Sequence, residues 1–345
     1  MNRNYKILLV VVIIGTVIGG AYATSKYLIG GSTPASQLVC ASGALLYTTN
    51  QPVVSQPPIA KESVQSSTSS RIPVVAAENF WGSLVSQLGG NLTSVTSIIT
   101  DPNTDPHEYE SNAQDAQAIA SAKFVIVNGA GYDDWAIQEI NANNNPSQVV
   151  LNVQELLRQP LGVNPHFWYS PYYVNQTVHQ MYTDLVKIDP GDVSIYASNY
   201  ANLNMSLGAY NTQITTISQQ FAGRRVASTE SIFVYLANAT NLDLISPSSF
   251  MEAVAEGNDP SPGCVALFES QLLNPNFPGN ATLLVYNEQT VTPLTQQLKA
   301  EAAKNGIPIV GVTETIQPTT FSFEQWMSSE LGDLQNGLNA NALGQ

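Results

Sequence analysis

The segment from Val193 to Phe221 constrains the fold of this chain more than any other. Apolar side chains recur along it at alternating intervals of four and three residues, which predicts one continuous helix with a single apolar face. Pro190 and Gly223 mark its two ends. At 1.5 Å per residue, a helix of 29 residues would extend over about 43 Å, longer than one small domain requires. The apolar face consists of Tyr196, Tyr200, Leu203, Leu207, Tyr210, Ile214, Ile217 and Phe221.

A helix of this length either joins two lobes of one chain or forms a coiled-coil dimer. A dimer of about four heptads would normally carry charged residues beside its apolar seam, and this segment has few. The pattern therefore favours a helix that joins two lobes of a monomer.

Strand and helix patterns alternate on both sides of this helix, which is typical of an α/β fold with mainly parallel sheets. Before it, strands are expected at 72–77, 95–99, 124–128 and 149–153, with a helix at 112–122 that Ser111 and Gln114 would cap. After it, strands are expected at 225–228, 242–245, 282–286 and 307–312, and helices at 231–239, 262–273, 291–305 and 321–338.

The predicted organisation has five parts. Residues 1–29 form a membrane anchor or signal peptide, and 30–70 a disordered tether rich in Ser, Thr, Pro and Gln. An N-terminal α/β lobe follows at 71–191, then the joining helix at 192–222 and a C-terminal α/β lobe at 223–345.

The first residues are typical of an export or anchor segment. Arg3 and Lys6 precede an uncharged, mostly apolar run, and Ala21-Tyr22-Ala23 offers a cleavage site. The run is at the short end of the roughly 20 residues that span a bilayer, so cleavage and retention both remain open. The spacer that follows is most useful if its other end is held, which favours a retained anchor. The positive charges before the apolar run agree with a folded part outside the cell. If the chain is cleaved after Ala23, the protein is secreted instead.

The charge balance points to a cation as partner. The chain has 12 basic and 26 acidic residues, a formal net charge of -14. Nucleic acid binding needs a basic patch, so this composition argues against it.

Two of the three histidines stand in matching frames. His107 and His166 each follow a proline and precede an aromatic residue by one or two positions. Proline stiffens the loop that presents each imidazole, which suits a metal ligand. Both histidines follow predicted strands, as do Glu230 and Glu314 in the second lobe. In open α/β folds, ligands bind at the carboxyl ends of strands.

Two imidazoles and two carboxylates form a donor set that suits Zn(II) or Mn(II). Each acid also has an ordinary explanation: Glu230 could favour the dipole of the following helix, and Glu314 could be a solvated loop residue. Asp105 and Glu110 could orient His107 or simply be loop acids.

Six stretches together resemble the zinc- and manganese-specific solute-binding proteins of ABC-type importers. The resemblance extends from Arg71 to about Gly337. The stretches are AENFWG at 77–82, DPHEYE at 105–110, NPHFW at 164–168, STESIFVYL at 228–236, PSP at 260–262 and GVTET at 311–315.

This resemblance implies two lobes bridged by a long helix, with one transition-metal ion held between them. It implies His107, His166 and Glu230 as ligands, with Glu314 where the family usually has Asp. Asn164 stands where Asp is commoner before Pro-His, which removes a carboxylate that could orient the imidazole. The His-rich loop of many zinc-type relatives is missing.

The expected function is therefore capture of one Zn(II) or Mn(II) ion outside the cell and its delivery to an ABC permease, without enzymatic activity. The alternatives are an extracellular metallohydrolase that uses the same ligands and an adhesive or structural surface protein. The chain has no His-Glu-x-x-His motif, and four protein ligands would leave no position for a catalytic water.

Overall fold

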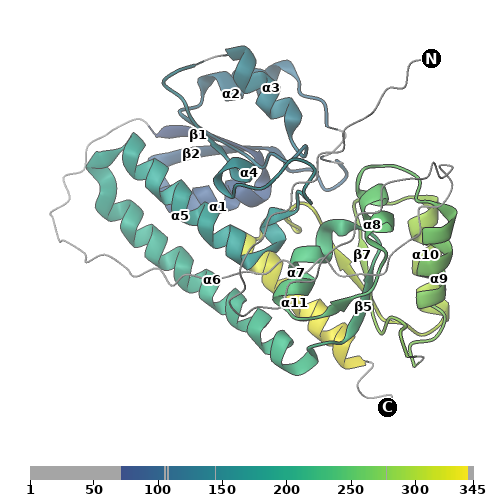
Figure 1. Cartoon of the computed structure of the whole chain (residues 1–345). Coiled ribbons are helices and arrows are strands. Elements are labelled where there is room, and N and C mark those ends of the chain that lie inside the picture. Colours follow the sequence, from purple (N-terminus) through teal and green to yellow (C-terminus); the bar gives the residue numbers. More distant parts are fainter. Residues whose placement is uncertain (1–70, 105, 107–108, 144, 277, 341–345) are drawn as a thin grey trace, which may run out of the picture. The chain divides into compact units, whose positions relative to one another are not determined.

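The chain forms two parallel four-stranded sheets (Figure 1). In the sequence, the strands of one sheet precede the long helix and those of the other follow it. The computed structural model describes residues 71–340 except 105, 107, 108, 144 and 277, and all of these belong to one compact unit of the chain. The predicted anchor at 1–29 and tether at 30–70 lie outside the described residues. Within residues 71–340, no helix is long and apolar enough to cross a membrane.

The first sheet has the strand order β2-β1-β3-β4. Its strands are β1 (Ile72–Glu78), β2 (Thr93–Ile99), β3 (Phe124–Val127) and β4 (Val149–Asn152). The helices connecting them are α1 (Asn79–Gly89), α2 (Ala113–Ser121) and α3 (Asp134–Asn143), and the short α4 (Val153–Leu156) follows β4.

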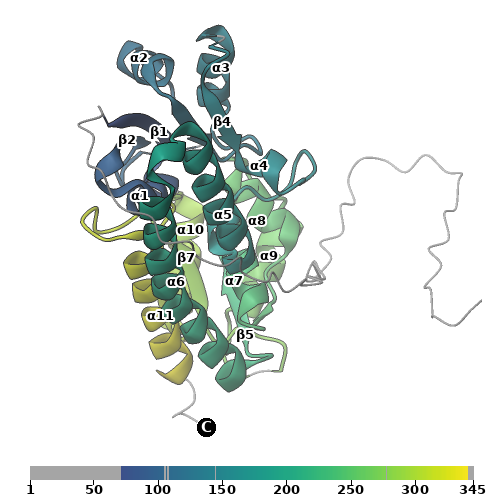
Figure 2. The ribbon, with the colours of Figure 1, turned by 90° about the vertical axis from the view of Figure 1, so that its left-hand side faces the viewer.

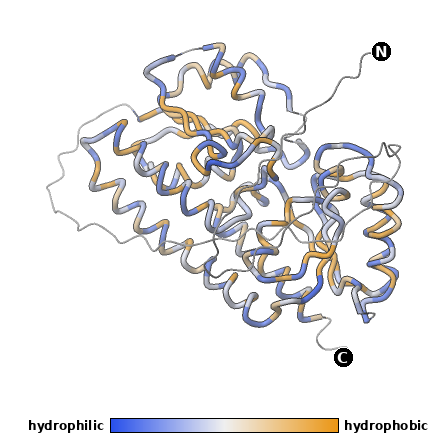
Figure 3. Tube along the Cα trace, in the orientation of Figure 1, coloured by the Kyte–Doolittle hydropathy of each residue, from blue (hydrophilic) through white to orange (hydrophobic). Residues whose placement is uncertain are grey.

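The second sheet repeats this arrangement with the order β6-β5-β7-β8. Its strands are β5 (Arg225–Ser228), β6 (Asp243–Leu244), β7 (Leu284–Asn287) and β8 (Ile309–Val312). Its helices are α7 (Val234–Ala239), α8 (Ser248–Ala255), α9 (Pro262–Gln271), α10 (Pro293–Lys304) and α11 (Phe323–Ala340). The hydropathy view shows apolar residues concentrated in the strands of both sheets (Figure 3).

The predicted joining helix is confirmed as α6 (Val193–Phe221), which follows α5 (Pro171–Ile188). Seven of the eight residues on its predicted apolar face are buried, and Tyr200 packs against them from a half-buried position. Met205, on the opposite face, is 69% exposed. The buried face packs against α1, α5 and α11, so one face of the helix contacts elements from both sides of the sequence.

Helix α11 provides a second connection between the two sheets. It lies beside α6 in both ribbon views and also packs against β8 and α1 (Figure 2). At its start, the Phe323 amide donates to Ser83 Oγ (2.9 Å), and Gln87 Nε2 donates to Glu324 Oε2 (3.0 Å). The C-terminal helix therefore contacts the first half of the chain directly.

The predicted cap of the second helix is wrong by one residue. Asn112 rather than Ser111 accepts the first amides, from Gln114 and Asp115, and Asp115 returns a bond to the Asn112 amide. Ser111 instead donates to Glu139 Oε1 at 2.7 Å. Serine and asparagine cap a helix about equally well, so capping propensity does not choose between Ser111 and Asn112. The hydrogen bond from Ser111 to Glu139 on α3 occupies the serine and leaves Asn112 as the cap.

Three helices, α3, α4 and α8, were not predicted from the sequence, and α4 has only four residues. Helix α3 buries only Ala136 completely, and its other apolar residues, Trp135, Ile137 and Ile140, are only partly buried, so its apolar pattern is short and weak. Helix α8 buries four residues but has only 8 in all, too few for a clear period.

Cys264 is buried at the start of α9. The only other cysteine in the sequence, Cys40, lies outside the described residues.

Candidate metal centre

Three of the four predicted ligands meet at one buried point. One donor atom from each of His166, Glu230 and Glu314 lies within 4.8 Å of the others, and all three side chains are 0% exposed. His107 and Asp105 lie outside the described residues, so their proposed roles stay predictions. Glu110 is exposed in the loop before α2, and its predicted role beside His107 also stays a prediction.

Each of the three side chains is presented where a strand or a short turn begins or ends. His166 precedes the 3-10 turn Phe167–Tyr169. Glu230 lies two residues after β5, and its Oε1 accepts a bond from the Ile232 amide (3.1 Å) at the start of the turn Ser231–Phe233. Glu314 lies two residues after β8. The helix-start role considered for Glu230 is therefore real, and the same carboxylate also lies in the cluster.

Hydrogen bonding determines how the His166 ring is oriented. Nδ1 lies 2.7 Å from Asn164 Oδ1, and Nε2 lies 3.3 Å from Glu230 Oε1. The amide oxygen can only accept, so Nδ1 carries a proton, and Nε2 faces the cluster, where its lone pair would be available to an ion once Nε2 is deprotonated. Asn164 thus supplies, through its amide oxygen, the acceptor that orients the imidazole. The rings of Trp168 and Tyr132 pack edge-on against the imidazole.

Glu314 is held by donors from both halves of the chain. The Tyr132 hydroxyl donates to Oε2 (2.8 Å), while Asn287 Nδ2 (2.8 Å) and Thr290 Oγ1 (3.0 Å) donate to Oε1. Asn287 Nδ2 also donates to Glu230 Oε2. Glu314 is therefore fixed in position and completely buried, and it is no solvated loop acid.

The sequence reasoning missed Asn287 and Tyr132, although one signal could have found Asn287. It is the last residue of β7, and the rule that ligands gather at strand ends applies to β7 as well as to β5 and β8. Asparagine is a less usual metal ligand than histidine or an acid, so its position alone does not distinguish it. Tyr132 belongs to the loop after β3 and had no distinguishing local pattern.

Gln289 organises the backbone around Glu314. Its Oε1 accepts from the amides of Glu314 (2.6 Å) and Thr315 (2.9 Å). Its Nε2 donates to the Pro102 carbonyl (3.0 Å) in the loop after β2. One glutamine therefore connects the Glu314 loop with the loop that leads to the predicted His107 segment.

The surroundings of the cluster are strongly acidic. Burial, followed by the charges of Glu314 and Glu78, raises the pKa of Tyr132, so its hydroxyl remains a neutral donor. Burial and the charge of Asp133 raise the pKa of Glu78 well above its ordinary value. The buried polar residues of the described chain include no lysine or arginine. A bound dication would supply the missing positive charge.

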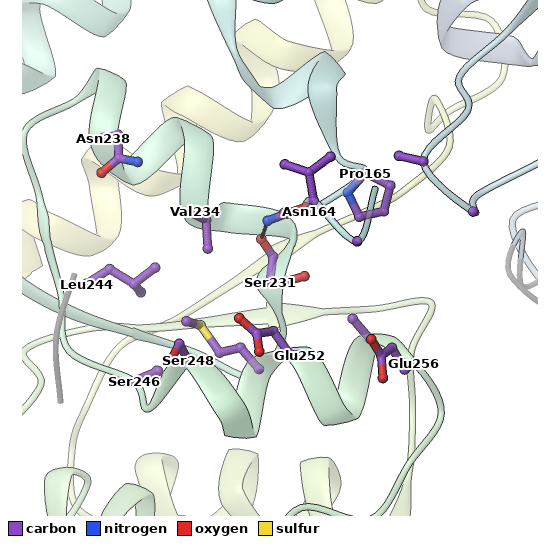
Figure 4. Close-up of a pocket in the computed structure, with 16 residues that line it drawn as sticks. Asn164, Pro165, Ser231, Val234, Asn238, Leu244, Ser246, Ser248, Glu252 and Glu256 are labelled. Carbon is purple, nitrogen blue, oxygen red and sulfur yellow. Dashed lines mark hydrogen bonds between the residues drawn. The ribbon is translucent and has the colours of Figure 1, made fainter. Parts of the chain in front are cut away.

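An open cleft of about 420 Å³ adjoins the site. Figure 4 shows it between Asn164 and Pro165 on one side and residues of α7 and α8 on the other. Ser231, next to Glu230, also lines it. The three ligands that the structure describes are buried and do not line the cleft, which reaches only their neighbours.

The donor set of one imidazole nitrogen and two carboxylates suits Zn(II) or Mn(II), both of which accept nitrogen and hard oxygen ligands. His166 has the outer hydrogen bond that ligating imidazoles usually have.

Comparison with known proteins gives a consistent result. The profile of the family described as zinc-uptake complex component A, periplasmic, matches residues 74–337. The manganese-binding lipoprotein MntA of Halalkalibacterium halodurans is 29% identical over 182 residues, which cover 50% of this chain and 59% of that protein.

Solved structures share the fold. The periplasmic zinc-binding protein TroA from Treponema pallidum superposes with a TM-score of 0.65 at 15% identity, covering 78% of this chain and 99% of that one. The binding protein FpvC from Pseudomonas aeruginosa, solved in complex with Mn²⁺, has a TM-score of 0.64 at 20% identity, covering 79% and 100%. The fold class predicted from the sequence is confirmed; the limits predicted for the lobes stay predictions.

Proposed function

We propose that this chain, which belongs to the family of periplasmic zinc-uptake components, captures one divalent transition-metal ion between its two sheets for an ABC-type importer. The observation that carries the proposal is the buried cluster of His166, Glu230 and Glu314, with donor atoms within 4.8 Å of one another. Three ionisable or ligating groups from distant parts of the sequence are costly to bury together without a positive charge.

His107 completes the proposed ligand set as a second imidazole. Its segment follows β2, and Gln289 connects the loop after β2 to the Glu314 loop. Four protein ligands would close the coordination sphere, as expected for a carrier that must hold and then release its ion.

Zn(II) and Mn(II) are both suitable cargo. Two carboxylates favour Mn(II) more than an all-histidine site would, whereas the general order of affinities favours Zn(II) at almost any such site. We propose that Zn(II) binds more tightly when both ions are offered. The printed names of the relatives include both a manganese-binding and a zinc-binding protein.

Delivery to a membrane permease outside the cell, by a monomer held through residues 1–29, completes the proposal. Family membership supports an extracytoplasmic location, and the lipoprotein relative is consistent with attachment to a membrane.

A metallohydrolase would use the same ligands but needs an open coordination position for water. The described ligands are completely buried and Glu314 already accepts three hydrogen bonds, which favours binding over catalysis. An adhesive protein would need no such cluster.

Metal analysis of the full chain, purified without chelators, tests the proposal. We expect one Zn(II) or Mn(II) per chain in the wild type and less than a tenth of that in His166→Ala and in His107→Ala. The exposed His179 on α5 provides the control, and His179→Ala should keep full occupancy. Calorimetric competition then ranks the two ions. Retained one-to-one binding in both ligand variants would refute this site, and metal-dependent hydrolysis of a phosphate or peptide substrate would favour the enzyme.

A further inference from the structure

Asn164 contacts both halves of the molecule with a single side chain. Its Oδ1 accepts from the His166 amide (3.0 Å) and lies 2.7 Å from His166 Nδ1. Its Nδ2 donates to the Ser231 carbonyl (2.7 Å), the bond drawn as a dashed line in Figure 4. Its own backbone carbonyl accepts from the Tyr235 hydroxyl (2.7 Å). Asn164 and His166 follow the first sheet in sequence, whereas Ser231 and Tyr235 follow β5 of the second.

The two ends of this amide have opposite requirements. The backbone N–H of His166 needs an acceptor, and the Ser231 carbonyl needs a donor, so the amide has one correct orientation. An aspartate would still accept from His166, but its second oxygen would face the Ser231 carbonyl without a hydrogen. Alanine would serve neither partner. Asparagine is therefore matched to a double task that aspartate cannot perform.

Both partners of the amide lie next to candidate ligands. His166 is itself one of the three clustered groups, and Ser231 directly follows Glu230. We call the part with the first sheet (β1–β4) the first half and the part with the second sheet (β5–β8) the second half. A displacement of the second half relative to the first would break the hydrogen bond from Asn164 Nδ2 to Ser231. It would also disturb Asn164 Oδ1, the acceptor that holds the imidazole.

The bond also lies where it can exchange with water. Asn164 and Ser231 both line the cleft of about 420 Å³. Water entering there can take over both hydrogen bonds once the halves separate, which lowers the cost of opening at this edge.

From this geometry we propose that Asn164 couples the orientation of His166 to the association of the two halves of the protein. It is a positioning residue: closed halves hold the amide, the amide holds the proton on Nδ1, and Nε2 then presents its lone pair to the ion. Opening at this edge releases the imidazole and so speeds release of the metal. The inference rests on the proposed function and adds a regulatory contact to it.

Rates of Zn(II) release from the full chain, measured by stopped-flow transfer to a chelator, test the coupling. We expect Asn164→Asp to release Zn(II) about tenfold faster than wild type, because the contact with Ser231 becomes repulsive. Tyr235→Phe should accelerate release about three- to tenfold. Asn164→Ala should lower equilibrium affinity about 10- to 100-fold, as loss of an outer contact to a metal-bound histidine usually does.

Asn238→Asp provides the matched control. Asn238 lines the same cleft but is exposed. Its replacement by aspartate adds the same negative charge as Asn164→Asp, at a side chain that contacts neither His166 nor Ser231. Its added carboxylate should attract the cation and leave release unchanged or slightly slower. Release that is equally fast in Asn164→Asp and Asn238→Asp, or wild-type release from Asn164→Asp, would overturn the coupling.

The tautomer of His166, measured by NMR, distinguishes the proposed role of Asn164 from a purely structural one. A purely structural role would leave the protonated nitrogen unchanged. In long-range ¹H–¹⁵N correlation spectra of the metal-free protein, where no ion fixes the tautomer, wild type and Asn164→Asp should show a protonated Nδ1 on His166. Asn164→Ala should show a mixture, and a wild-type spectrum from that variant would contradict the assignment. A wild-type protein that binds no Zn(II), or binds it without His166, refutes the metal site itself and the coupling with it.

Discussion

Asn287 lies between the two carboxylates of the candidate site. Its Nδ2 donates to Glu230 and to Glu314, so a neutral amide partly compensates two negative charges at the place where a cation is proposed to bind. Hydrogen bonds to charged groups contribute about 1.5 to 3 kcal/mol each. At the scale of single residues, the site is therefore held together by neutral donors: Asn287, Thr290 and Tyr132.

Removing this amide should destabilise the metal-free protein selectively. We expect Asn287→Ala to lower the free energy of unfolding by about 2 to 4 kcal/mol in the presence of a chelator, because two buried carboxylates lose their shared donor. Zn(II) should restore part of this loss, since it replaces the missing positive charge. Urea unfolding with and without Zn(II) measures both. Asn238→Ala is the exposed control, and an equal loss in that variant would contradict the explanation.

Glu330 is a buried carboxyl that is not one of the candidate ligands. The Tyr169 hydroxyl has one hydrogen but faces two acceptors, Glu330 Oε2 (2.7 Å) and the Thr313 carbonyl (2.9 Å). Both contacts are satisfied if Glu330 is protonated and donates to Tyr169, which then donates to Thr313. Burial, the main cause, raises the pKa of Glu330 to about 8, in agreement with this arrangement.

The raised pKa of Glu330 determines a pH dependence of stability. The folded protein keeps this proton above pH 4.5, where the unfolded chain loses it, so the stabilisation is complete below about pH 4.5 and is lost as the pH rises toward 8. We expect the unfolding free energy of the metal-free protein to fall by a few kcal/mol between pH 5 and pH 8.

The variant Glu330→Gln isolates this contribution. Because it keeps the shape and cannot ionise, it should make the slope in urea unfolding at pH 5, 6.5 and 8 clearly smaller than in wild type, and the slope that remains is expected from Glu78 and Asp133, whose pKa values burial also raises. Asp333→Asn changes an exposed carboxylate on the same helix and should leave the slope intact. A slope that is identical in wild type and Glu330→Gln would contradict the assignment.

At the scale of elements, α6 is the part that the local pattern determined best. Its limits, its buried face and its joining position all follow from an apolar stripe that repeats every three or four residues between Pro190 and Gly223. The stripe contains eight apolar positions that all fit one helical period, so the prediction does not depend on any single residue. Short elements such as α8, or polar ones such as α3, have no such redundancy, so tertiary contacts decide them.

Truncation on the buried face of α6 should be costly. Leu207 is 1% exposed, so Leu207→Ala should lower the free energy of unfolding by about 2 to 5 kcal/mol. Met205 lies on the same helix at 69% exposure, and Met205→Ala should change it by less than about 0.5 kcal/mol. Chemical denaturation of both variants makes the comparison. Equal effects would mean that the stripe does not face the core in solution.

At the scale of the whole molecule, the proposed ion links the two sheets. His166 follows the first sheet, whereas Glu230 and Glu314 follow strands of the second, so a bound cation would connect parts that are otherwise joined by α6, α11 and a few hydrogen bonds. Such a ligand stabilises the folded state by mass action, by about 4 kcal/mol at a free concentration 1,000 times its dissociation constant.

Metal removal should therefore lower the melting temperature at neutral pH by several degrees, and the effect should shrink in acid. Imidazole must be deprotonated to bind a metal, so the increment from Zn(II) should decrease below about pH 6. Calorimetric melting at pH 7.5 and pH 5, with Zn(II) or chelator, tests this. The melting temperature of the metal-free protein should instead be higher at pH 5 than at pH 7.5, because Glu330 keeps its proton in the folded state. An increment from Zn(II) that is unchanged at pH 5 would exclude histidine ligation.

The sequence by itself determined the class of fold, the joining helix and the histidine and acids worth testing, because these depend on periodicity and on positions relative to strands. Only the tertiary structure decided that His166, Glu230 and Glu314 meet, that Asn287 and Tyr132 hold the carboxylates, and that Asn164 contacts Ser231. These contacts join residues 27 to 182 positions apart. Local propensity carries no information about such distances, which are fixed by how two sheets pack against shared helices.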